Sequence, residues 1–357
     1  MKVVVGVDGG GTFTRAMCAA LDGTVLGYAE AGGAHPGKNA DAADNVRRAI
    51  GGALGEAVRG AGDVAAIVAG IAGFNHPDVD ARWADAFTDL PGLKGGVPRR
   101  HVNDAVVAHA GAFGAQRAGI VVIAGTGSIV FGVTPAGRHV RNYDFNHFGR
   151  STARDLGYAA VYRILAGDWD PASDRPLVDA VLGAWRADDV PALCALAGQS
   201  HAENPQDVMR RFGALAPLVT RAALDGVPLG RRICDTVAGE LEMAVRIVGA
   251  CFANESGPPA PNNGGERRGG DSGSEVLVAL VGSVVNSSYV AQALRHALAA
   301  TPPATPELRY VVVPPAFSSV AGAVLMALNA AAIAVGAEAS SPVRVNLARH
   351  AKAGAGE

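Results

Sequence analysis

Two short turns in the sequence combine glycines with a hydroxyl residue, each directly after an apolar run. The first is Asp8-Gly9-Gly10-Gly11-Thr12, and the second is Gly125-Thr126-Gly127-Ser128. Glycine lets a ligand approach the backbone without meeting a Cβ atom, and several N–H groups pointing into one turn form an anion-binding concavity. Two such turns on opposing halves of a protein would hold one polyphosphate. Ordinary tight hairpins are the alternative, because an isolated glycine motif is a weak signal.

A carboxylate stands beside the first turn. Asp8 would repel a bare phosphate, but it suits a Mg²⁺ ion held through water, since Mg²⁺ prefers oxygen ligands and usually keeps several waters. The turn is neither a Walker loop nor a Rossmann fingerprint, because no Gly-Lys-Thr/Ser ends it and a strand rather than a helix is expected to follow. Asp8 is therefore predicted to lie next to a nucleotide-bound metal.

The elements that must position these turns follow the same order in both halves of the chain. The expected strands of the first half are at 3–7, 15–20, 25–29, 64–70 and 100–102, with Asp22-Gly23 as a hairpin turn. Its helical patterns are at 40–59, 79–90 and from 105. The second half has expected strands at 119–124, 129–134, 276–281 and 308–313, and helical patterns at 153–166, 177–186, 191–197, 205–251, 287–299 and 316–335. This repeat predicts a duplicated mixed α/β architecture.

The charge balance of the chain limits which kinds of molecule it is expected to bind. The 357 residues are 49% hydrophobic, and 31 basic against 33 acidic residues give a net charge of -2. Such a balance attracts neither nucleic acid nor an anionic membrane, so neither is an expected partner. The four cysteines include no CxxC pair and are expected to be buried free thiols.

The sequence also predicts where the protein resides and which segments lie outside the packed core. Asp8 and three glycines interrupt the first apolar run, which argues against a signal peptide, and no apolar stretch approaches the roughly 20 residues of a membrane span. We therefore expect a soluble cytoplasmic protein. The stretch 254–274 is rich in Pro, Gly, Asn and Ser and predicts a mobile surface loop, and 337–357 predicts a poorly ordered tail.

Several motifs together resemble one known family. DGGGT followed by a hairpin, IAGTGS at mid-chain and VGSVV at 281–285 resemble the two phosphate loops and the adenosine loop of the actin, sugar-kinase and heat-shock-chaperone superfamily. The BadF/BadG/BcrA/BcrD-type ATPase family, which includes the N-acetylglucosamine kinases, is the closer resemblance. It is supported by AGIAGFNHP at 69–77, HVNDAVVAHAGAFG at 101–114 and VVVPPAFSSVAGAVLMAL at 311–328.

The resemblance implies two ribonuclease-H-like lobes around a central nucleotide cleft, and a homodimer. It predicts an N-terminal lobe at 1–104, a C-terminal lobe with a helical insertion at 105–315, and a closing helix at 316–336 that packs back on the N-terminal lobe. ATP and Mg²⁺ are the implied cofactors, with a sugar as the second substrate. The implied cofactor-binding residues are Asp8, Gly10, Gly11, Thr12, Thr126, Gly127, Ser128, Gly282 and Ser283. At Ser283 the family usually has a second glycine.

The same resemblance implies a catalytic base. Asn103-Asp104 matches the family's Asn-Asp pair at the cleft floor, which makes Asp104 the candidate to take the proton of the sugar hydroxyl. Asp is also among the best helix-capping residues, so Asp104 can be an N-cap, and the two roles can coexist. Asn39 and Gly73 match sugar-contacting positions, although Asn39 also suits an ordinary loop and Gly73 the end of a strand.

One stretch departs from the family pattern. Family kinases usually carry a Gly-Asp-Glu-Gly-Ser run, whereas this chain has NHFGRSTARDLGYAAVYRIL at 146–165. Asp155 is the only carboxylate nearby, and it either replaces the missing acid at the sugar or pairs with a neighbouring arginine. Arg150 and Arg154 are additional, and they would tolerate an anionic substrate. The substrate can therefore be N-acetylglucosamine, a related hexosamine, an unusual sugar or a non-sugar hydroxyl.

Three functions compete. The leading interpretation is an ATP-dependent sugar kinase acting on N-acetylglucosamine or a related hexosamine. The second is an ATPase activator of a partner reductase or dehydratase, whose family members hold an iron–sulfur cluster through cysteines; no close cysteine pair supports it here. The third is a catalytically silent nucleotide or sugar sensor, suggested by the altered acidic run.

Overall fold

The computed structural model describes residues 1–57, 64–74, 97–114, 117–199, 203–253, 274–300 and 308–335. The predicted helix at 79–90, the predicted tail and all but the last residue of the predicted loop at 254–274 lie outside the described residues. The chain divides into two compact units, one formed by Met1–Val121 with the segment from Pro314 onward, and the other by Val122–Val313.

The first unit is built on a five-stranded sheet with the order β3-β2-β1-β4-β5. Its strands are β1 (Val3–Gly9), β2 (Phe13–Ala20), β3 (Val25–Gly32), β4 (Val64–Ile71) and β5 (Arg99–Asn103). The first three strands are antiparallel neighbours, whereas β4 runs parallel to β1 and β5 parallel to β4. The predicted turn between β2 and β3 is confirmed, since Gly23 has a φ of 85° and its N–H donates to Ala20 O over 2.9 Å.

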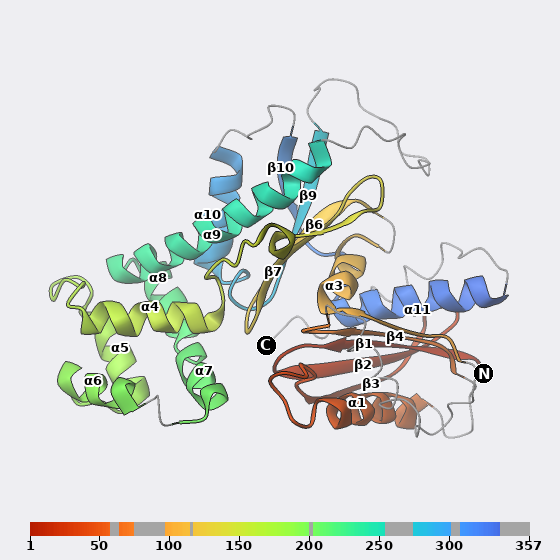
Figure 1. The fold of residues 1–357 in the computed structure, drawn as a ribbon, viewed down its shortest axis with the longest axis horizontal. Coiled ribbons are helices and arrows are strands. Elements are labelled where there is room, and N and C mark those ends of the chain that lie inside the picture. Colours follow the sequence, from red (N-terminus) through yellow and green to blue (C-terminus); the bar gives the residue numbers. More distant parts are fainter. Residues whose placement is uncertain are drawn as a thin grey trace. The chain divides into compact units, whose positions relative to one another are not determined.

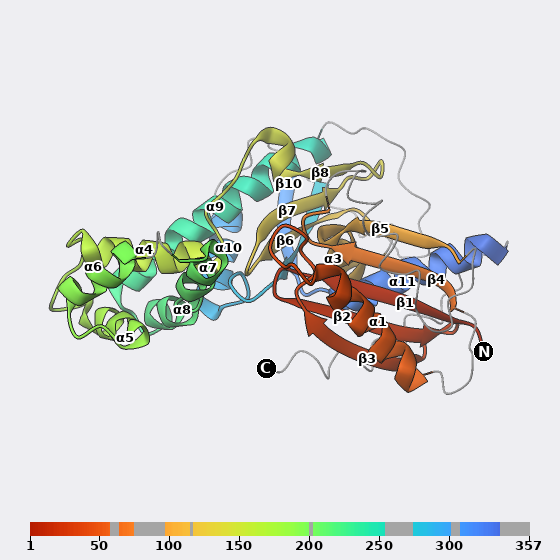
Figure 2. The ribbon, with the colours of Figure 1, turned by 60° about the horizontal axis from the view of Figure 1, so that its bottom comes forward.

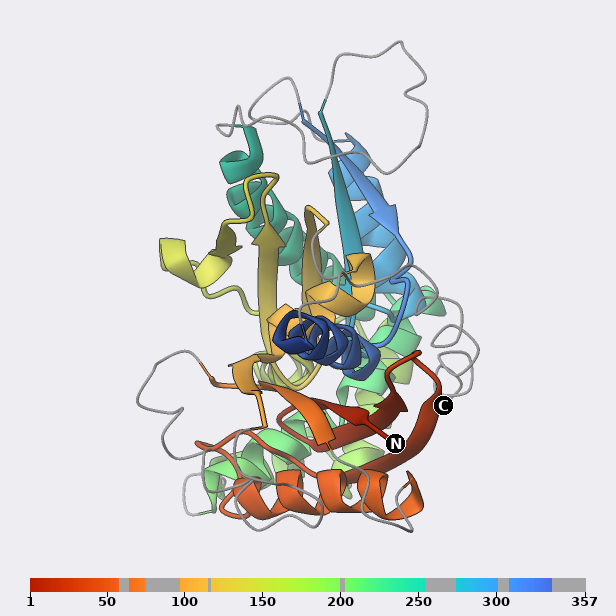
Figure 3. The same cartoon turned by 90° about the vertical axis from the view of Figure 1, so that its right-hand side faces the viewer.

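Helices cover both faces of this sheet. Figure 1 shows α1 (Ala42–Ala57) on one face and α11 (Ser319–Val335) with α3 (Asp104–Phe113) on the other, and Figure 3 shows the same layers with α11 almost end-on. Side chains alternate along a strand, so Val3, Val5 and Val7 pack in the core under α1 while Val4 packs against α11. The core of this unit therefore combines residues from segments that lie far apart in the sequence.

The two helices on the second face approach each other closely. A Cβ atom added at Gly322 of α11 would lie 2.1 Å from Val107 O and 2.3 Å from Gly111 N of α3. Because α3 packs here, it belongs to the first unit, which extends to Val121.

The second unit repeats the same sheet order. Its strands are β6 (Gly119–Ala124), β7 (Ser128–Val133), β8 (His139–Arg141), β9 (Ser274–Val281) and β10 (Leu308–Val313), arranged β10-β9-β6-β7-β8, and the division between the units falls within β6. Counted from the first strand of each half, both sheets have the order 3-2-1-4-5. The predicted duplicated ribonuclease-H-like fold is confirmed.

A helical insertion follows β8 and a short 3₁₀ helix, η2 (Asn142–Phe145), and it leads back to β9; Figure 2 shows its helices together. The helices of this unit are α4 (Ala153–Leu165), α5 (Arg175–Trp185), α6 (Val190–Gln199), α7 (Pro205–Gly213), α8 (Ala216–Leu224), α9 (Pro228–Ala253) and α10 (Ser288–Ala300). The single helical pattern expected at 205–251 is wrong, because α7, α8 and α9 divide it. Pro217 and Pro228 begin new helices, and Gly226 has a φ of 93° between them.

The close packing of α3 and α11 predicts an intolerance of side-chain volume. Gly322→Ala should lower the free energy of unfolding by about 1–3 kcal/mol, because the new methyl group meets backbone atoms that cannot yield easily. Gly51→Ala in α1 is the matched control, since nothing lies within 4 Å of its Cβ position, and it should raise stability by about 0.5–1 kcal/mol. Urea unfolding of both variants measures the difference, and equal stabilities would contradict the packing argument.

Candidate active site

The first part of the site lies at the carboxyl-end edge of the parallel strands in the first unit. Gly9 of β1 pairs with Ile71 of β4, which pairs with Asn103 of β5. The turn after Asp8, the turn at 72–74 and the start of α3 therefore meet at one edge, where α/β proteins commonly hold their ligands. This register brings Asp8 and Asp104, which are far apart in the sequence, to the same place.

A loop after β3 joins the first glycine turn to the turn after β4. Asn39 Nδ2 donates to Gly11 O over 3.1 Å, and Ala34 N donates to Gly10 O over 2.9 Å. The His35 ring lies against Gly73, where a Cβ atom would be 2.7 Å from His35 Nε2 and the φ is 81°. The structure thus brings the predicted residues Asn39 and Gly73 to the first turn. Their predicted contact with a sugar stays a prediction.

The residue that caps α3 is Asn103 rather than Asp104. The Asn103 side chain accepts a hydrogen bond from Ala105 N at 3.0 Å, and its own Nδ2 donates to Phe74 O over 3.4 Å. Asp104 is the first residue of the helix, and its Oδ1 also accepts from Ala105 N at 3.1 Å. Because Asn103 provides the cap, helix α3 does not depend on Asp104 for its N-terminus.

The surroundings of the two carboxyl groups raise both of their pKa values. Burial raises the pKa of Asp8 to about 6, an effect that nearby Arg15 partly offsets. Burial, and then the negative charge of Asp8, raise the pKa of Asp104 to about 7, against a smaller lowering by hydrogen bonds and Lys38. Both residues are nevertheless partly exposed. Asp104 can therefore hold or release a proton near neutral pH and is reachable from solvent.

The same pair suits a divalent cation. The charge of Asp8 acts on Asp104, so the two carboxyl groups lie close together and form an oxygen donor set, which favours a hard cation over a bare anion. The residues thus fit the Mg²⁺ ion that the family resemblance implies. Asp8, at the end of β1 beside Gly10, Gly11 and Thr12, is the residue that would hold it.

The second glycine turn lies at the start of α4 in the other unit. Gly125 N donates to Gly127 O over 2.9 Å, which closes the turn, and Gly125 O accepts from Ala153 N at 2.7 Å. Thr126 and Gly127 are exposed, and Ser128 Oγ forms a 2.6 Å hydrogen bond with Ser151 Oγ. The turn is thus held to the first residues of α4 on one side while its tip stays accessible.

The turn after β9 lies against the second glycine turn. Gly282 has a φ of 108°, and a Cβ atom there would lie 2.5 Å from Ala124 O. The same Ala124 O accepts from Val284 N at 3.0 Å. The Cβ position of Gly125 is 3.6 Å from Ser283 N, so the structure brings together the predicted second phosphate turn and the predicted adenosine turn.

Asp155 has a structural role at the N-terminus of α4. Its Oδ2 accepts from Thr152 N at 2.9 Å and from Thr152 Oγ1 at 2.7 Å, while Asp155 N donates to Thr152 Oγ1. Its Oδ1 lies 3.8 Å from Arg154 Nε. These bonds form a capping box, which the sequence interpretation missed although Thr152 with Asp155 three residues later was its signal. A sugar contact of Asp155 stays a prediction.

Duplicated sheets carrying these glycine turns define the fold class of the sugar kinases and actin-like ATPases. Residues 5–161 match the sequence profile of the BadF/BadG/BcrA/BcrD ATPase family, and the resemblance seen in the sequence is confirmed. A curated relative is the N-acetylmuramic acid/N-acetylglucosamine kinase of Clostridium acetobutylicum, which is 27% identical over 263 residues, covering 70% of this chain and 79% of the relative.

Solved structures show the same fold over nearly the whole chain. A Chromobacterium violaceum protein assigned as an N-acetylglucosamine kinase has 26% identity and a TM-score of 0.63, covering 92% of this chain and 99% of its own. A ROK family glucokinase from Streptomyces griseus, solved with glucose and AMPPNP, has 17% identity and a TM-score of 0.55, covering 91% of this chain and 98% of its own. Among the described helices, none combines the length and the apolar character needed to cross a membrane.

The raised pKa of Asp104 predicts a pH-dependent stability. An unfolded Asp ionises near pH 4, so between about pH 4 and pH 7 the native state holds more protons, and this carboxyl reduces stability as the pH rises through that range. In metal-free buffer, Asp104→Asn should therefore be more stable than the parent by about 1–2 kcal/mol at pH 8, and the gap should close near pH 4. Urea unfolding at the two pH values checks this; a gap that is the same at both would contradict it.

Proposed function

We propose that this protein transfers a phosphoryl group from ATP to a sugar hydroxyl, with N-acetylglucosamine or a related hexosamine as the acceptor. The relatives that match over most of the chain carry this activity in their names, and one of them also names N-acetylmuramic acid. That sugar is N-acetylglucosamine with a lactic acid ether, so it adds a carboxylate to the list of acceptors. The arginines at 150 and 154 are compatible with this acidic form.

The observation that carries the proposal is the environment of Asp104. Its carboxyl group is partly exposed at the carboxyl-end edge of the sheet, and its pKa is raised to about 7. A general base works best when its pKa lies near the working pH, because it is then often deprotonated and still accepts a proton readily. In the proposed reaction Asp104 takes the proton of the attacking sugar hydroxyl.

Other residues bind and align the substrates. Gly10, Gly11 and Thr12, together with Thr126, Gly127 and Ser128, are proposed to donate to the nucleotide phosphates, and Gly282 and Ser283 to contact the adenosine. Asn39, Gly73, Asn103 and Asp155 are proposed to contact the sugar. A Mg²⁺ ion near Asp8, when bound, supplies neutralisation of the phosphate charge. A homodimer, a cytoplasmic location and the domain boundaries drawn from the sequence are carried forward as predictions.

The two competing functions make different demands on the chain. An activator would need thiolates for its cluster, but burial raises the pKa of the Cys18 thiol to about 11 and that of Cys234 to about 12, which keeps both protonated. Cys194 is exposed and Cys251 is half-buried, so the prediction that all four cysteines are buried is wrong for these two. A silent sensor would have no need of a carboxyl group poised to accept a proton. Nothing in the described part of the chain favours either alternative over the kinase.

A substrate panel tests the proposed activity. Purified protein is given ATP and Mg²⁺ with glucose, N-acetylglucosamine, glucosamine or N-acetylmuramic acid, and ADP release is coupled to NADH oxidation. We expect ADP release only when a hexosamine is present, because a hydroxyl group of that sugar accepts the phosphoryl group. ADP release that ignores the sugar would point to an ATPase, and silence across the panel would favour a sensor.

Replacement of the proposed base tests the mechanism. Asp104→Asn should reduce kcat by a factor of about 100 or more, because the amide cannot take the hydroxyl proton. Folding and ATP binding should persist, since Asn103 caps α3. Asp44→Asn, on the exposed face of α1, is the control and should keep full activity. Near-normal turnover of Asp104→Asn would remove this residue from its proposed role.

A further inference from the structure

The loop after β3 contains a histidine, His35, to which the proposed mechanism gives no role. The backbone is fixed on both sides of it, since Ala34 N donates to Gly10 O over 2.9 Å and His35 O accepts from Lys38 N and Asn39 N, each at 3.0 Å. The His35 side chain is half-buried. Its ring therefore has a defined position next to the first glycine turn.

The protonation state of this ring follows from its contacts. Gly37 N donates to His35 Nδ1 over 3.1 Å, so Nδ1 carries no hydrogen. Burial and then the positive charge of Lys38 lower the pKa of His35, which keeps the ring neutral at neutral pH. A neutral imidazole whose Nδ1 accepts has its hydrogen on Nε2. That N–H group makes no hydrogen bond with any residue that the structure describes, so His35 holds one unused donor.

The unused donor lies at the turn after β4. A Cβ atom at Gly73 would be 2.7 Å from His35 Nε2, so the imidazole ring occupies the space that a side chain would fill there. Phe74 O, in the same turn, accepts from Asn103 Nδ2 at 3.4 Å, and Asn103 directly precedes the proposed base, Asp104. The turn thus connects the ring of His35 with the start of α3.

The charge of Lys38 gives a second link between His35 and Asp104. This charge contributes to the lowered pKa of His35 and partly offsets the rise that burial and Asp8 cause in the pKa of Asp104. Interactions between solvent-accessible charges are largely screened beyond about 10 Å, so Lys38 lies near both groups. All of these residues belong to the first unit.

We propose that the Nε2–H group of His35 binds an oxygen atom of the acceptor sugar and thereby positions the reacting hydroxyl group at Asp104. The inference rests on the proposed kinase function and adds a sugar-binding residue to it. A neutral ring with one donor recognises a hydroxyl or carbonyl oxygen rather than a charge. Because the donor loses its water when the sugar binds, a sugar without an oxygen at this point leaves it unpaired and binds more weakly.

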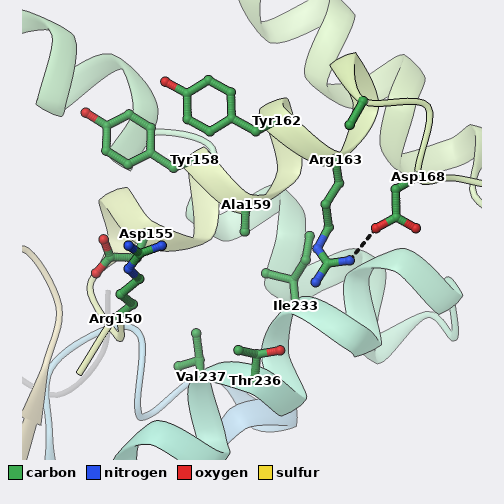
Figure 4. Close-up of a pocket in the computed structure, with 11 residues that line it drawn as sticks. Arg150, Asp155, Tyr158, Ala159, Tyr162, Arg163, Asp168, Ile233, Thr236 and Val237 are labelled. Atoms are coloured by element: carbon green, nitrogen blue, oxygen red, sulfur yellow. Dashed lines mark hydrogen bonds and ion pairs between the residues drawn. The ribbon is translucent and has the colours of Figure 1, made fainter.

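The second unit contains a different cavity that a sugar can enter. A pocket of about 680 Å³ lies between α4 and α9 (Figure 4), a volume that suits a small organic ligand. Ala159, Ile233 and Val237 make much of its lining apolar, Arg150 lies at one end, and the exposed Thr236 also lines it. The test must therefore distinguish this pocket from the site at His35.

The test combines a variant with sugar analogues. Calorimetry on the full chain with ADP and Mg²⁺ measures the affinity for N-acetylglucosamine, for its 3-deoxy, 4-deoxy and 6-deoxy analogues, and for glucose, which lacks the acetamido group. His35→Phe should weaken the binding of N-acetylglucosamine about three- to tenfold. For one of the other sugars it should change nothing, because the oxygen that His35 binds is already absent. An equal loss with every sugar, or no loss at all, would overturn the inference.

Two further variants separate the donor from the conformation of the loop. His35→Asn keeps an acceptor for Gly37 N but places no group at the position of Nε2, so it should lose as much affinity as His35→Phe. His35→Gln places an amide N–H group near that position and should recover part of the affinity. Full affinity in His35→Asn would show that the loop, and not the donor, matters, and would contradict the proposal.

A control in the second unit and the parent protein distinguish the remaining outcomes. Thr236→Phe adds an aromatic ring to the pocket between α4 and α9 and should leave the affinity for N-acetylglucosamine unchanged. A loss in this variant with none in His35→Phe would place the sugar in the pocket and refute the inference. If the parent releases ADP with a hexosamine while His35→Phe binds every sugar as the parent does, the proposed kinase stands and only the inference fails. If the parent binds no sugar, both fail.

Discussion

The candidate site depends on two carboxyl groups that the fold forces together. Asp8 lies next to the last residue of β1 and Asp104 directly follows β5, and these strands flank β4, so the register of the sheet places both residues at one edge. In water two such groups would both be ionised at neutral pH, but here burial raises both pKa values, and the charge of Asp8 raises the pKa of Asp104 further. Burial of two neighbouring carboxyl groups lowers the stability of the fold, and the packing of the surrounding apolar core offsets this loss. That core is the valine-rich β1 between α1 and α11.

The corresponding edge of the sheet in the second unit carries different charged residues. Its sheet also carries a glycine turn, but this turn is bonded to the start of a helix, α4, whose cap occupies the carboxylate of Asp155. The positive side chain of Arg150 is left without an internal partner among the described residues. The two halves of the duplicated fold have therefore diverged in charge: one edge collects acids, and the other presents a cation beside a pocket.

Much of this architecture could be predicted from the sequence, because strand patterns and glycine turns are local signals. The boundaries of β1, β6 and α4 agree closely with the apolar runs at 3–7, 119–124 and 153–166. The pattern at 205–251 was misleading, since helical periodicity continues across Pro217 and Pro228 although the backbone cannot. The site was harder to predict, because contacts such as Asn39 with Gly11 depend on how distant loops fold back.

The division of labour between Asn103 and Asp104 shows a further limit. Both are good capping residues, and no sequence rule decides which of two neighbours turns its oxygen toward the helix N–H groups. The structure gives the cap to Asn103. The raised pKa of Asp104 likewise arises from burial and from a charge almost a hundred positions away, as the residue numbers show, and neither is visible in a local motif.

The position of α11 has a consequence for how the protein is made. This helix, at 319–335, covers one face of a sheet that begins at Val3, whereas all strands and helices of the second unit after β6 lie between them in the chain. During synthesis Val4, Ala66 and Val68 of the N-terminal sheet stay uncovered until residues 319–335 have left the ribosome. The intervening unit can complete its fold earlier. Helix α11 thus completes the core of the unit whose strands are made first.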